Sequence, residues 1–291
     1  MSNTLNRALR ERLTPGAALL VPGAANALAA RIIERGGFAA VYVTGAGIAN
    51  SYLGVPDIGL LSLTELAQHV AAMRAAVTLP LIVDADTGFG NAINVAHTVK
   101  TLEQAGANAI QLEDQEFPKK CGHFAGKAVI DAAEMAMKVK AAVDARRDPD
   151  LLIIARTDAI AVTGFEDALA RAALYREAGA DLTFVEAPRS RGEIERIPQA
   201  LGCPQVMNIV SGGLTPMLPQ AELARLGYAA VLYANAALQA AMQAMTETLA
   251  HLQRTGSLAG AEPMLMDFAE RQAIVGKDTY DTLERKYTLD K

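Results

Sequence analysis

The 291-residue sequence predicts a (β/α)8 barrel of the TIM type, formed by a single domain over residues 1–291. Three observations support this fold. A pattern of helix end, glycine and apolar strand recurs along the chain, the strands are apolar throughout, and strands alternate with helical segments eight times. Continuous apolar strands indicate a sheet that is covered on both faces and is therefore parallel. Repeated alternation of strand and helix is typical of a barrel.

The recurring pattern is clearest in four places. A helix ends in a polar turn, a glycine stops it by adopting a left-handed conformation, and an apolar strand follows within a few residues. The four copies occupy residues 34–43, 103–112, 177–185 and 225–233.

Eight strands and seven intervening helices follow from this pattern and from the helical spacing of apolar residues. The predicted strands are residues 18–22, 40–44, 81–84, 109–113, 151–156, 182–186, 205–209 and 229–233. The predicted helices are residues 24–35, 63–73, 91–105, 131–145, 168–176, 191–200 and 219–226. A doubly wound open sheet is the alternative, but the first strand-to-helix turn lacks the G-x-G-x-x-G of that fold.

Residues 236–291 form a helical extension after the eighth strand, where a barrel needs only one helix. Helices are predicted over residues 236–254, 263–276 and 278–286. The apolar face of the middle helix, formed by Met264, Leu265, Met266 and Phe268, must be buried. It packs either against its own barrel or against a second subunit, and the sequence leaves both open.

Composition argues against several classes of partner. The net charge of −5 and the lack of a basic tract do not suit a nucleic-acid-binding protein. No apolar run approaches the roughly 20 residues that span a bilayer, and the polar N-terminus lacks the core of a signal peptide. Two cysteines, Cys121 and Cys203, are too few for a disulfide framework. We therefore expect a cytoplasmic protein without membrane or nucleic-acid partners.

Polar residues gather at the carboxyl ends of the predicted strands, where barrels carry their chemistry. Each residue alone could be a helix cap or part of a turn. Several carboxylates at one rim, however, repel one another unless a cation is present. The residues at or just after strand ends include Tyr42, Thr44, Gly45, Ala46, Asp84, Asp86, Glu113, Arg156, Glu186 and Asn208.

Asp84, Asp86 and Glu113 are the candidate metal ligands. They supply only oxygen atoms, which suits Mg²⁺, or alternatively Mn²⁺, better than zinc. Such a cation would chelate a 2-oxo or 2-hydroxy acid and stabilise an enolate. Arg156 could hold a substrate carboxylate through two hydrogen bonds.

Residues 119–123, Lys-Lys-Cys-Gly-His, place a thiol, an imidazole and two ammonium groups side by side. Nearby cations favour the thiolate form of a cysteine, and the glycine allows close approach to a ligand. We interpret this stretch as a loop that closes over an anionic substrate and delivers a proton or a nucleophile. A solvated basic turn is the alternative.

Four motifs together resemble the isocitrate lyase / phosphoenolpyruvate mutase superfamily along nearly the whole chain. They are Asp-x-Asp-Thr-Gly-Phe-Gly at 84–90, Glu-Asp-Gln at 113–115, Lys-Lys-Cys-Gly-His at 119–123 and Ala-Arg-Thr-Asp-Ala at 155–159. The resemblance implies a barrel that binds Mg²⁺ and an enolate intermediate. It also implies a homotetramer, built as a dimer of dimers that exchange a C-terminal helix.

Within that superfamily, the motif at 119–123 resembles the carbon–carbon lyases that act on isocitrate, 2-methylisocitrate or 2,3-dimethylmalate. The resemblance implies that Cys121 protonates the departing carbanion and that Lys119 and His123 orient it. Glu113 and Arg156 complete the implied catalytic set. The implied substrate-binding residues are Tyr42, Thr44, Gly45, Ala46, Asp57 on the loop 53–59, Gly122, Arg156, Glu186 and Asn208.

Three departures from the 2-methylisocitrate lyase pattern concern the substrate. Phe124 stands where an arginine is usual, residues 208–213 read Asn-Ile-Val-Ser-Gly-Gly, and strand eight ends in Tyr-Ala-Asn at 233–235. The first two remove polar contacts and favour a smaller or more apolar dicarboxylate, because an unpaired substrate charge is costly in an apolar pocket.

The leading hypothesis is a Mg²⁺-dependent lyase that cleaves a substituted 2-hydroxy dicarboxylate to pyruvate, or a related oxo acid, and a carboxylic acid. A second hypothesis keeps the metal site but predicts an oxaloacetate hydrolase or decarboxylase, or an enzyme that breaks or rearranges a phosphonate P–C bond. A third is a non-catalytic barrel that binds keto acids.

Overall fold

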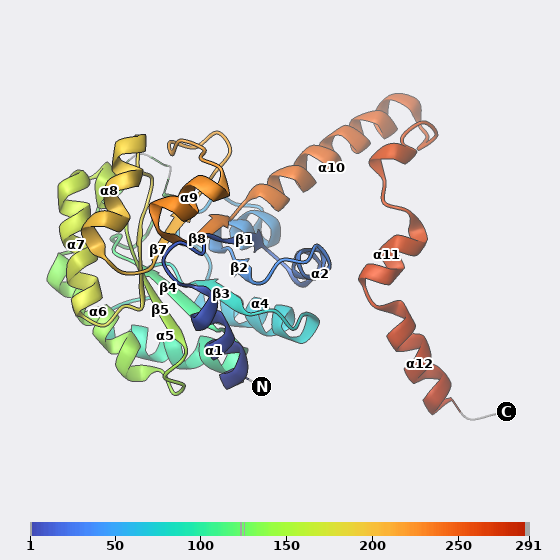
Figure 1. Cartoon of the computed structure of the whole chain (residues 1–291). Coiled ribbons are helices and arrows are strands. Elements are labelled where there is room, and N and C mark those ends of the chain that lie inside the picture. Colours follow the sequence, from blue (N-terminus) through green and yellow to red (C-terminus); the bar gives the residue numbers. More distant parts are fainter. Residues whose placement is uncertain (1, 123, 125, 289–291) are drawn as a thin grey trace.

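The computed structural model describes residues 2–122, 124 and 126–288 and contains a closed barrel of eight parallel strands in sequential order (Figure 1). The barrel fold and its strand order confirm the prediction. The strands are β1 Leu19–Ala24, β2 Val41–Val43, β3 Leu81–Asp84, β4 Ala109–Glu113, β5 Leu152–Thr157, β6 Leu182–Val185, β7 Gln205–Asn208 and β8 Tyr228–Tyr233.

Helices surround the barrel, as the alternation of strands and helices predicts. They are α2 Ala27–Arg35, α3 Gly45–Ile48, α4 Leu63–Ala76, α5 Ala92–Ala105, α6 Ala132–Ala145, α7 Phe165–Glu177, α8 Arg191–Leu201 and α9 Gln220–Leu226. A single π-helical turn, Ala49–Leu53, and a 3-10 turn, Ala159–Ala161, lie among them. The prediction that a helix begins at residue 24 is wrong, because β1 continues to Ala24. The Asn26 side chain caps α2 instead by accepting a hydrogen bond from Ala29 N at 2.9 Å.

Alternate residues of each strand divide between two cores. In β4, Ala109 faces the barrel interior, where it packs with residues such as Ile82 of β3 and Ile154 of β5. Ile110 and Leu112 face the helices and belong to the larger outer core. Residues of β4 that follow the parity of Ala109 therefore open into the mouth of the barrel.

Helix α1, Ser2–Arg12, closes the N-terminal end of the barrel and was not predicted. Its Leu9 is fully buried and belongs to the interior core. Asn6 donates a hydrogen bond to Asp148 Oδ2 at 2.7 Å and accepts one from Asn108 at 2.6 Å. The opposite end of the barrel is left for the functional site.

The C-terminal extension leaves the barrel as an arm (Figure 1). It contains α10 Ala236–Thr255, a 3-10 turn Glu262–Met264, α11 Phe268–Ile274 and α12 Lys277–Tyr287. The predicted single helix over 263–276 is wrong, because Asp267 starts a new helix by accepting hydrogen bonds from Ala269 N and Glu270 N. No residue of α10 is buried. The contacts of α11 with α2 include the Arg35–Glu270 ion pair at 2.6 Å.

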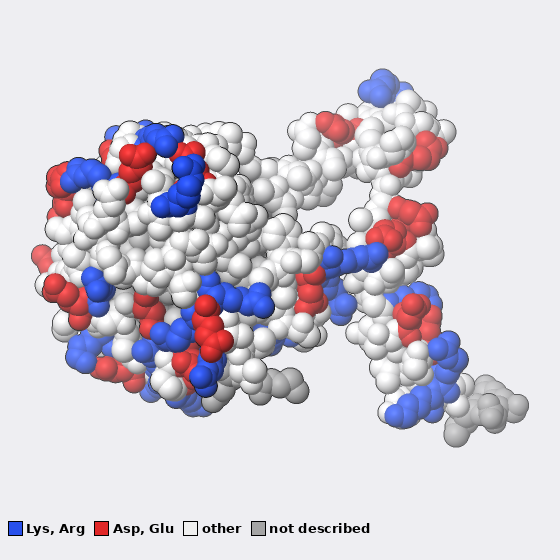
Figure 2. Space-filling model, in the orientation of Figure 1, with Lys and Arg blue, Asp and Glu red and all other residues white. Residues whose placement is uncertain are grey.

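The surface carries both signs of charge. On the face drawn in Figure 2, blue and red side chains are interspersed over the barrel and the arm, without a continuous basic patch. In the described part of the chain, no helix is long and apolar enough to cross a membrane.

Candidate active site

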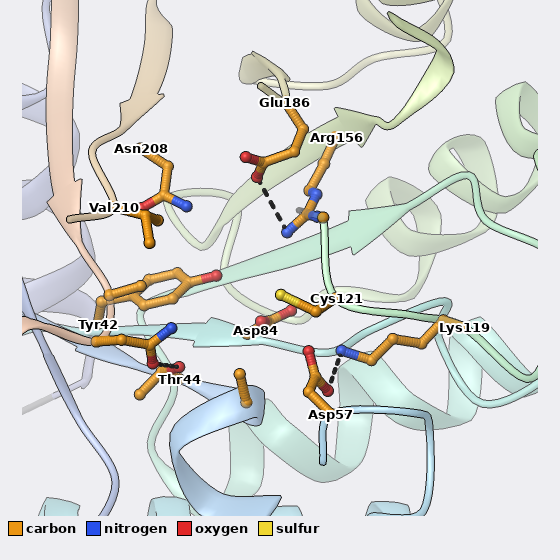
Figure 3. Close-up of a pocket in the computed structure, with 14 residues that line it drawn as sticks. Tyr42, Thr44, Asp57, Asp84, Lys119, Cys121, Arg156, Glu186, Asn208 and Val210 are labelled. Atoms are coloured by element: carbon orange, nitrogen blue, oxygen red, sulfur yellow. Dashed lines mark hydrogen bonds and ion pairs between the residues drawn. The ribbon is translucent and has the colours of Figure 1, made fainter. Parts of the chain in front are cut away.

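A small cavity of about 30 Å³ lies at the carboxyl end of the barrel (Figure 3). Tyr42 and Cys121 point into it from opposite sides, with Asp84 behind them and Arg156 beside Glu186. The cavity therefore collects residues from strands far apart in the sequence. Its lining residues are Tyr42, Thr44, Ala46, Asp57, Asp84, Lys119, Cys121, Gly122, Arg156, Glu186, Asn208, Val210, Ala234 and Asn235.

The end of β2 and the short helix α3 form one wall. Thr44 caps α3 by accepting a hydrogen bond from Gly47 N at 3.1 Å, and its hydroxyl lies 3.4 Å from Asn235 Oδ1. Gly45 does not line the cavity but supports it. A Cβ added there would lie 3.3 Å from Asp86 Oδ1 and 3.5 Å from Asp84 Oδ2. Two carboxylates thus converge beside this glycine.

Lys119 is the cation that faces these acids. Its Nζ lies 2.6 Å from Asp57 Oδ1 and 2.7 Å from Asp86 Oδ1, and its side chain is 4% exposed. Burial opposes its charge, but Asp86, Glu113 and Asp57 raise the pKa of Lys119 well above its usual value. Burial raises the pKa of Asp86 to about 6, with Lys119 opposing the shift and Asp84 and Asp57 adding to it. Because the pKa of Lys119 is raised in this way, its ammonium group stays charged.

Glu113 does not line the cavity. Its Oε1 accepts a hydrogen bond from Gln115 Nε2 at 2.9 Å, and its Oε2 lies 3.3 Å from Arg156 Nε. Burial raises the pKa of Glu113 well above its usual value, while Arg156 acts in the opposite direction. Glu113 thus connects the acidic side of the site to Arg156.

Arg156 is held by Asp158 in a two-pronged contact. Arg156 Nε and Nη2 donate to the two Asp158 carboxylate oxygens at 2.8 and 3.1 Å. Arg156 Nη1 lies 3.4 Å from Glu186 Oε2 (Figure 3). Burial lowers the pKa of Arg156, but the carboxylates of Asp158, Glu113 and Glu186 raise it. The net effect is a pKa well above the usual value. The guanidinium therefore stays charged beside the cavity.

The segment that carries Cys121 closes the remaining side. Cys121 N donates a hydrogen bond to Asp57 O at 3.1 Å, which joins the segment to the loop after the π-helical turn Ala49–Leu53. Gly122 packs directly on Arg156, since a Cβ added there would lie 2.5 Å from Arg156 Nη2. Only glycine allows this approach. His123 lies outside the described residues.

Phe124 does not border the cavity, so the structure does not support a direct contribution of its side chain to substrate choice. The side chain is 46% exposed, and Phe124 N donates to Cys121 O at 2.8 Å in a turn. Phe124 nevertheless carries no charge, unlike the arginine that is usual at this position in the 2-methylisocitrate lyase pattern.

Several residues of the site were not named as site residues from the sequence, although 208–213 and 233–235 were singled out as segments that concern the substrate. Val210, Ala234 and Asn235 line the cavity. Gln111 donates to Asp84 Oδ1 at 3.3 Å, and its position two residues before Glu113 was the available signal. Lys127 Nζ lies 2.7 Å from Asp158 Oδ1, and neither residue lines the cavity. The spacing of the two residues in the sequence does not predict this contact.

The predicted metal ligands are only partly brought together by the fold. Among the described residues, no three His, Cys, Asp or Glu side chains are grouped to hold a metal ion. Asp84 and Asp86 do converge beside Gly45, and Mg²⁺ commonly takes only one or two carboxylates and keeps waters or substrate oxygens. Glu113, turned toward Gln115 and Arg156, fits an outer position.

The fold and these motifs have clear relatives. Residues 9–253 match the family described as phosphoenolpyruvate phosphomutase. The chain belongs to this family, in the isocitrate lyase / phosphoenolpyruvate mutase superfamily. This membership confirms the resemblance inferred from the four motifs.

Individual members of the family are similar over nearly their full length. The 2,3-dimethylmalate lyase of Eubacterium barkeri is 43% identical over 96% of this chain and 96% of its own. The 2-methylisocitrate lyase of Aeropyrum pernix is 42% identical over 94% of this chain and 88% of its own. A solved structure of phosphonopyruvate hydrolase in complex with oxalate and Mg²⁺ is 32% identical, covers 99% of both chains and has a TM-score of 0.87.

Proposed function

We propose that the protein is a Mg²⁺-dependent carbon–carbon lyase that cleaves a substituted 2-hydroxy dicarboxylate of the 2,3-dimethylmalate type. The products are pyruvate, or a related oxo acid, and a carboxylic acid. The observation that carries the proposal is the position of Cys121 opposite Tyr42 and beside Asp84 and Arg156 in one cavity. The similarity to a 2,3-dimethylmalate lyase and a 2-methylisocitrate lyase supports it.

The chain's own residues bind the substrate and supply a proton. Arg156 holds a substrate carboxylate, and the buried Asn208 Oδ1, which accepts no hydrogen bond from a described residue, is available for a substrate hydroxyl. As the C2–C3 bond breaks, the C2 hydroxyl becomes a carbonyl, and its proton passes to a carboxylate that lines the cavity, which returns a proton to Cys121 after turnover. Cys121 donates a proton to C3, and the charge of Lys119 favours the thiolate that remains.

Asp84 and Asp86 are the residues that would hold the metal, with Glu113 in the outer position. Bound Mg²⁺ would supply a Lewis acid that stabilises negative charge on the oxo-acid oxygens. Solved phosphonopyruvate hydrolase, a relative of the same fold, carries Mg²⁺ with oxalate. Mn²⁺ would satisfy the same oxygen donors.

The cavity favours two substrate carboxylates and an alkyl substituent. Its cationic side chains, among the described lining residues, are Lys119 and Arg156, and each already pairs with protein carboxylates. Val210 and Ala234 add apolar surface. A third substrate carboxylate would have no described lysine or arginine to meet, which costs binding energy. We therefore expect 2,3-dimethylmalate to be preferred over 2-methylisocitrate and isocitrate.

Cys121→Ser tests the proposal with a matched control. We expect wild type to convert 2,3-dimethylmalate in the presence of Mg²⁺ and Cys121→Ser to lower kcat by about 10²- to 10⁴-fold, the range for loss of a general acid. Cys203→Ser is the control, because Cys203 is buried beside Thr183 and Gln205 and away from the cavity. Full activity of Cys121→Ser would exclude the proton-donor role.

The second candidate is a hydrolase, decarboxylase or phosphonate-acting enzyme on the same site, which the similarity to phosphonopyruvate hydrolase favours. Product analysis distinguishes it. Oxalate and acetate from oxaloacetate, or phosphate from a phosphonate, would replace the lyase proposal. Binding of oxalate without turnover of any tested substrate would favour a non-catalytic barrel.

We also propose a cytoplasmic homotetramer in which residues 1–291 act as one domain and the 236–291 arm, whose α11 contacts α2 of its own barrel, also packs on a neighbouring subunit. The unburied α10 supports the assembly. The two cysteines, which form no disulfide, suit a reducing compartment. Light scattering on the full chain tests the assembly, and a monomeric mass at micromolar concentration would exclude it.

A further inference from the structure

Lys127 is a buried cation for which the proposed reaction has no direct use. Its side chain is 1% exposed, and its Nζ lies 2.7 Å from Asp158 Oδ1. The same Nζ donates a hydrogen bond to the carbonyl oxygen of Gly122. Burying an ammonium group is costly unless it is paired and hydrogen-bonded. These two contacts therefore define where Lys127 sits.

Through Asp158, Lys127 reaches the substrate-binding arginine. The two Asp158 oxygens accept hydrogen bonds from Arg156 Nε and Nη2 at 2.8 and 3.1 Å, and one of them also meets Lys127. Burial alone would raise the pKa of Asp158, but Arg156 and Lys127 lower it to about 2. One ionised carboxylate is thus shared between the two cations.

Through the Gly122 carbonyl, Lys127 reaches the proposed proton donor. Gly122 follows Cys121 directly and packs on Arg156, since an added Cβ would lie 2.5 Å from Arg156 Nη2. A shift of the Gly122 peptide would therefore move the backbone that carries the thiol and change the space around the guanidinium. Lys127 is in contact with both sides of this arrangement.

We propose that Lys127 is a positioning residue that fixes the Cys121–Gly122 backbone and the Arg156–Asp158 pair in a single arrangement. Lys127 does not line the cavity and so acts through its neighbours. The inference rests on the proposed function, because it assumes that Cys121 and Arg156 act on the same substrate. It adds that their relative placement depends on one ammonium group.

Lys127→Met and Lys127→Arg test this role. Methionine keeps the length of the side chain and removes the charge and donor, and we expect kcat to fall by about 10- to 100-fold because small displacements of reacting groups are costly. KM should rise severalfold, and the amide of Cys121, which donates to Asp57 O, should exchange its hydrogen faster. Lys127→Arg should restore most of kcat. Lys140→Met, which removes an exposed ion pair with Asp144, is the matched control and should stay within twofold of wild type.

A double-mutant cycle with Asp158→Asn shows whether Lys127 acts through its carboxylate partner. We expect the fold-loss in kcat of the double variant to be smaller than the product of the fold-losses of the two single variants. Residues that belong to one network behave in this way. Independent multiplication of the two losses would overturn the proposal. So would kcat and KM of Lys127→Met within twofold of wild type. Lys127→Gln replaces Lys127→Met in the same assays if the methionine variant does not fold.

The proposed function and this inference fail in different ways. If wild type converts none of the substrates, the lyase proposal fails, and oxalate affinity measured by calorimetry then decides the role of Lys127. Weaker oxalate binding and faster Cys121 amide exchange in Lys127→Met would support positioning. Unchanged values for both would overturn it.

Discussion

The two ends of the barrel both bury polar side chains, but they satisfy them differently. At the N-terminal end, Asn6, Asn108 and Asp148 form a chain that is held mainly by side-chain amides and backbone groups, with Arg74 Nη1 also donating to Asn108 Oδ1 at 3.4 Å. Asn108 donates to Asn6 at 2.6 Å and accepts from Leu81 N at 2.8 Å. Asp148 accepts from Asn6 and from Asp150 N at 2.7 and 2.9 Å. This end holds α1 against the barrel.

At the carboxyl end, charged groups face other charged groups. Asp86 has a pKa raised to about 6, mainly by burial, and Asp158 has a pKa lowered to about 2 by Arg156 and Lys127 in spite of burial. Carboxylates with such different protonation behaviour within one site are typical of catalysis. Burial of polar groups therefore does not by itself mark a functional site. What distinguishes the carboxyl end is that buried cations and buried carboxylates contact one another directly.

Removal of Mg²⁺ should show the largest difference between the two ends of the barrel, because it should affect turnover at the carboxyl end and leave the fold intact. If the proposed site binds Mg²⁺, dialysis against a chelator should lower turnover of 2,3-dimethylmalate by more than about 10³-fold and added Mg²⁺ should restore it, because a bound metal would supply charge stabilisation that the carboxylates cannot. Circular dichroism should show an intact barrel throughout. Undiminished turnover in the chelator would contradict the metal site at Asp84 and Asp86.

Arg156→Lys should have the next largest effect. We expect kcat/KM to fall by about 10³-fold, roughly 4 kcal/mol. Lysine cannot replace the two-pronged contact that the Arg156 guanidinium makes with Asp158. Arg176→Lys is the control, since Arg176 donates to the Leu201 carbonyl away from the cavity at 2.7 Å. A kcat/KM for Arg156→Lys within threefold of wild type would remove Arg156 from the substrate site.

Asn108→Ala should show the opposite behaviour, with loss of stability and no loss of kcat. The change leaves the Leu81 amide and the Asn6 carbonyl oxygen without their partner, which costs about 3 kcal/mol of unfolding free energy. Urea denaturation measures the loss, and Gln104→Ala on the exposed side of α5 is the control. A lowered kcat in Asn108→Ala at temperatures where it is folded would show that the two ends are not independent.

Asp158 should make stability depend on pH in acid. Its pKa in the folded protein, about 2, lies below the usual 3.8. Its ionised form thus stabilises the fold by about 2 kcal/mol above pH 4, and this contribution is lost as the pH falls toward 2. The difference in unfolding free energy between wild type and Asp158→Asn should therefore shrink between pH 5 and pH 3. A difference that stays constant or grows would contradict the assignment, and Asp144→Asn on the exposed face of α6 is the control.

The barrel could be predicted from sequence because its signals are local. Buried parallel strands are continuous apolar runs, and glycines such as Gly106, with φ of 107°, end the helices that precede them. The errors lie where local signals are weak. Helix α1 is recognised only through Leu9 packing in the barrel, and the 263–276 segment breaks because Asp267 prefers to cap a helix.

The site could be predicted only in part for a related reason. Asp84, Glu113 and Arg156 lie at or next to strand ends, and the fold brings strand ends together. The partners of these residues depend on packing between distant segments. That Lys119 sits between Asp57 and Asp86, or that Lys127 meets Asp158, follows from the folded loops and not from spacing.

The last residue of β4 and the one after it face opposite ways. Glu113 points toward Arg156, while Asp114 accepts hydrogen bonds from Thr157 and from Tyr175 of α7 at 2.7 Å each. A one-residue insertion or deletion within β4 would exchange the two carboxylates, because the strand alternates sides at every residue. The length of β4 is therefore fixed to the single residue.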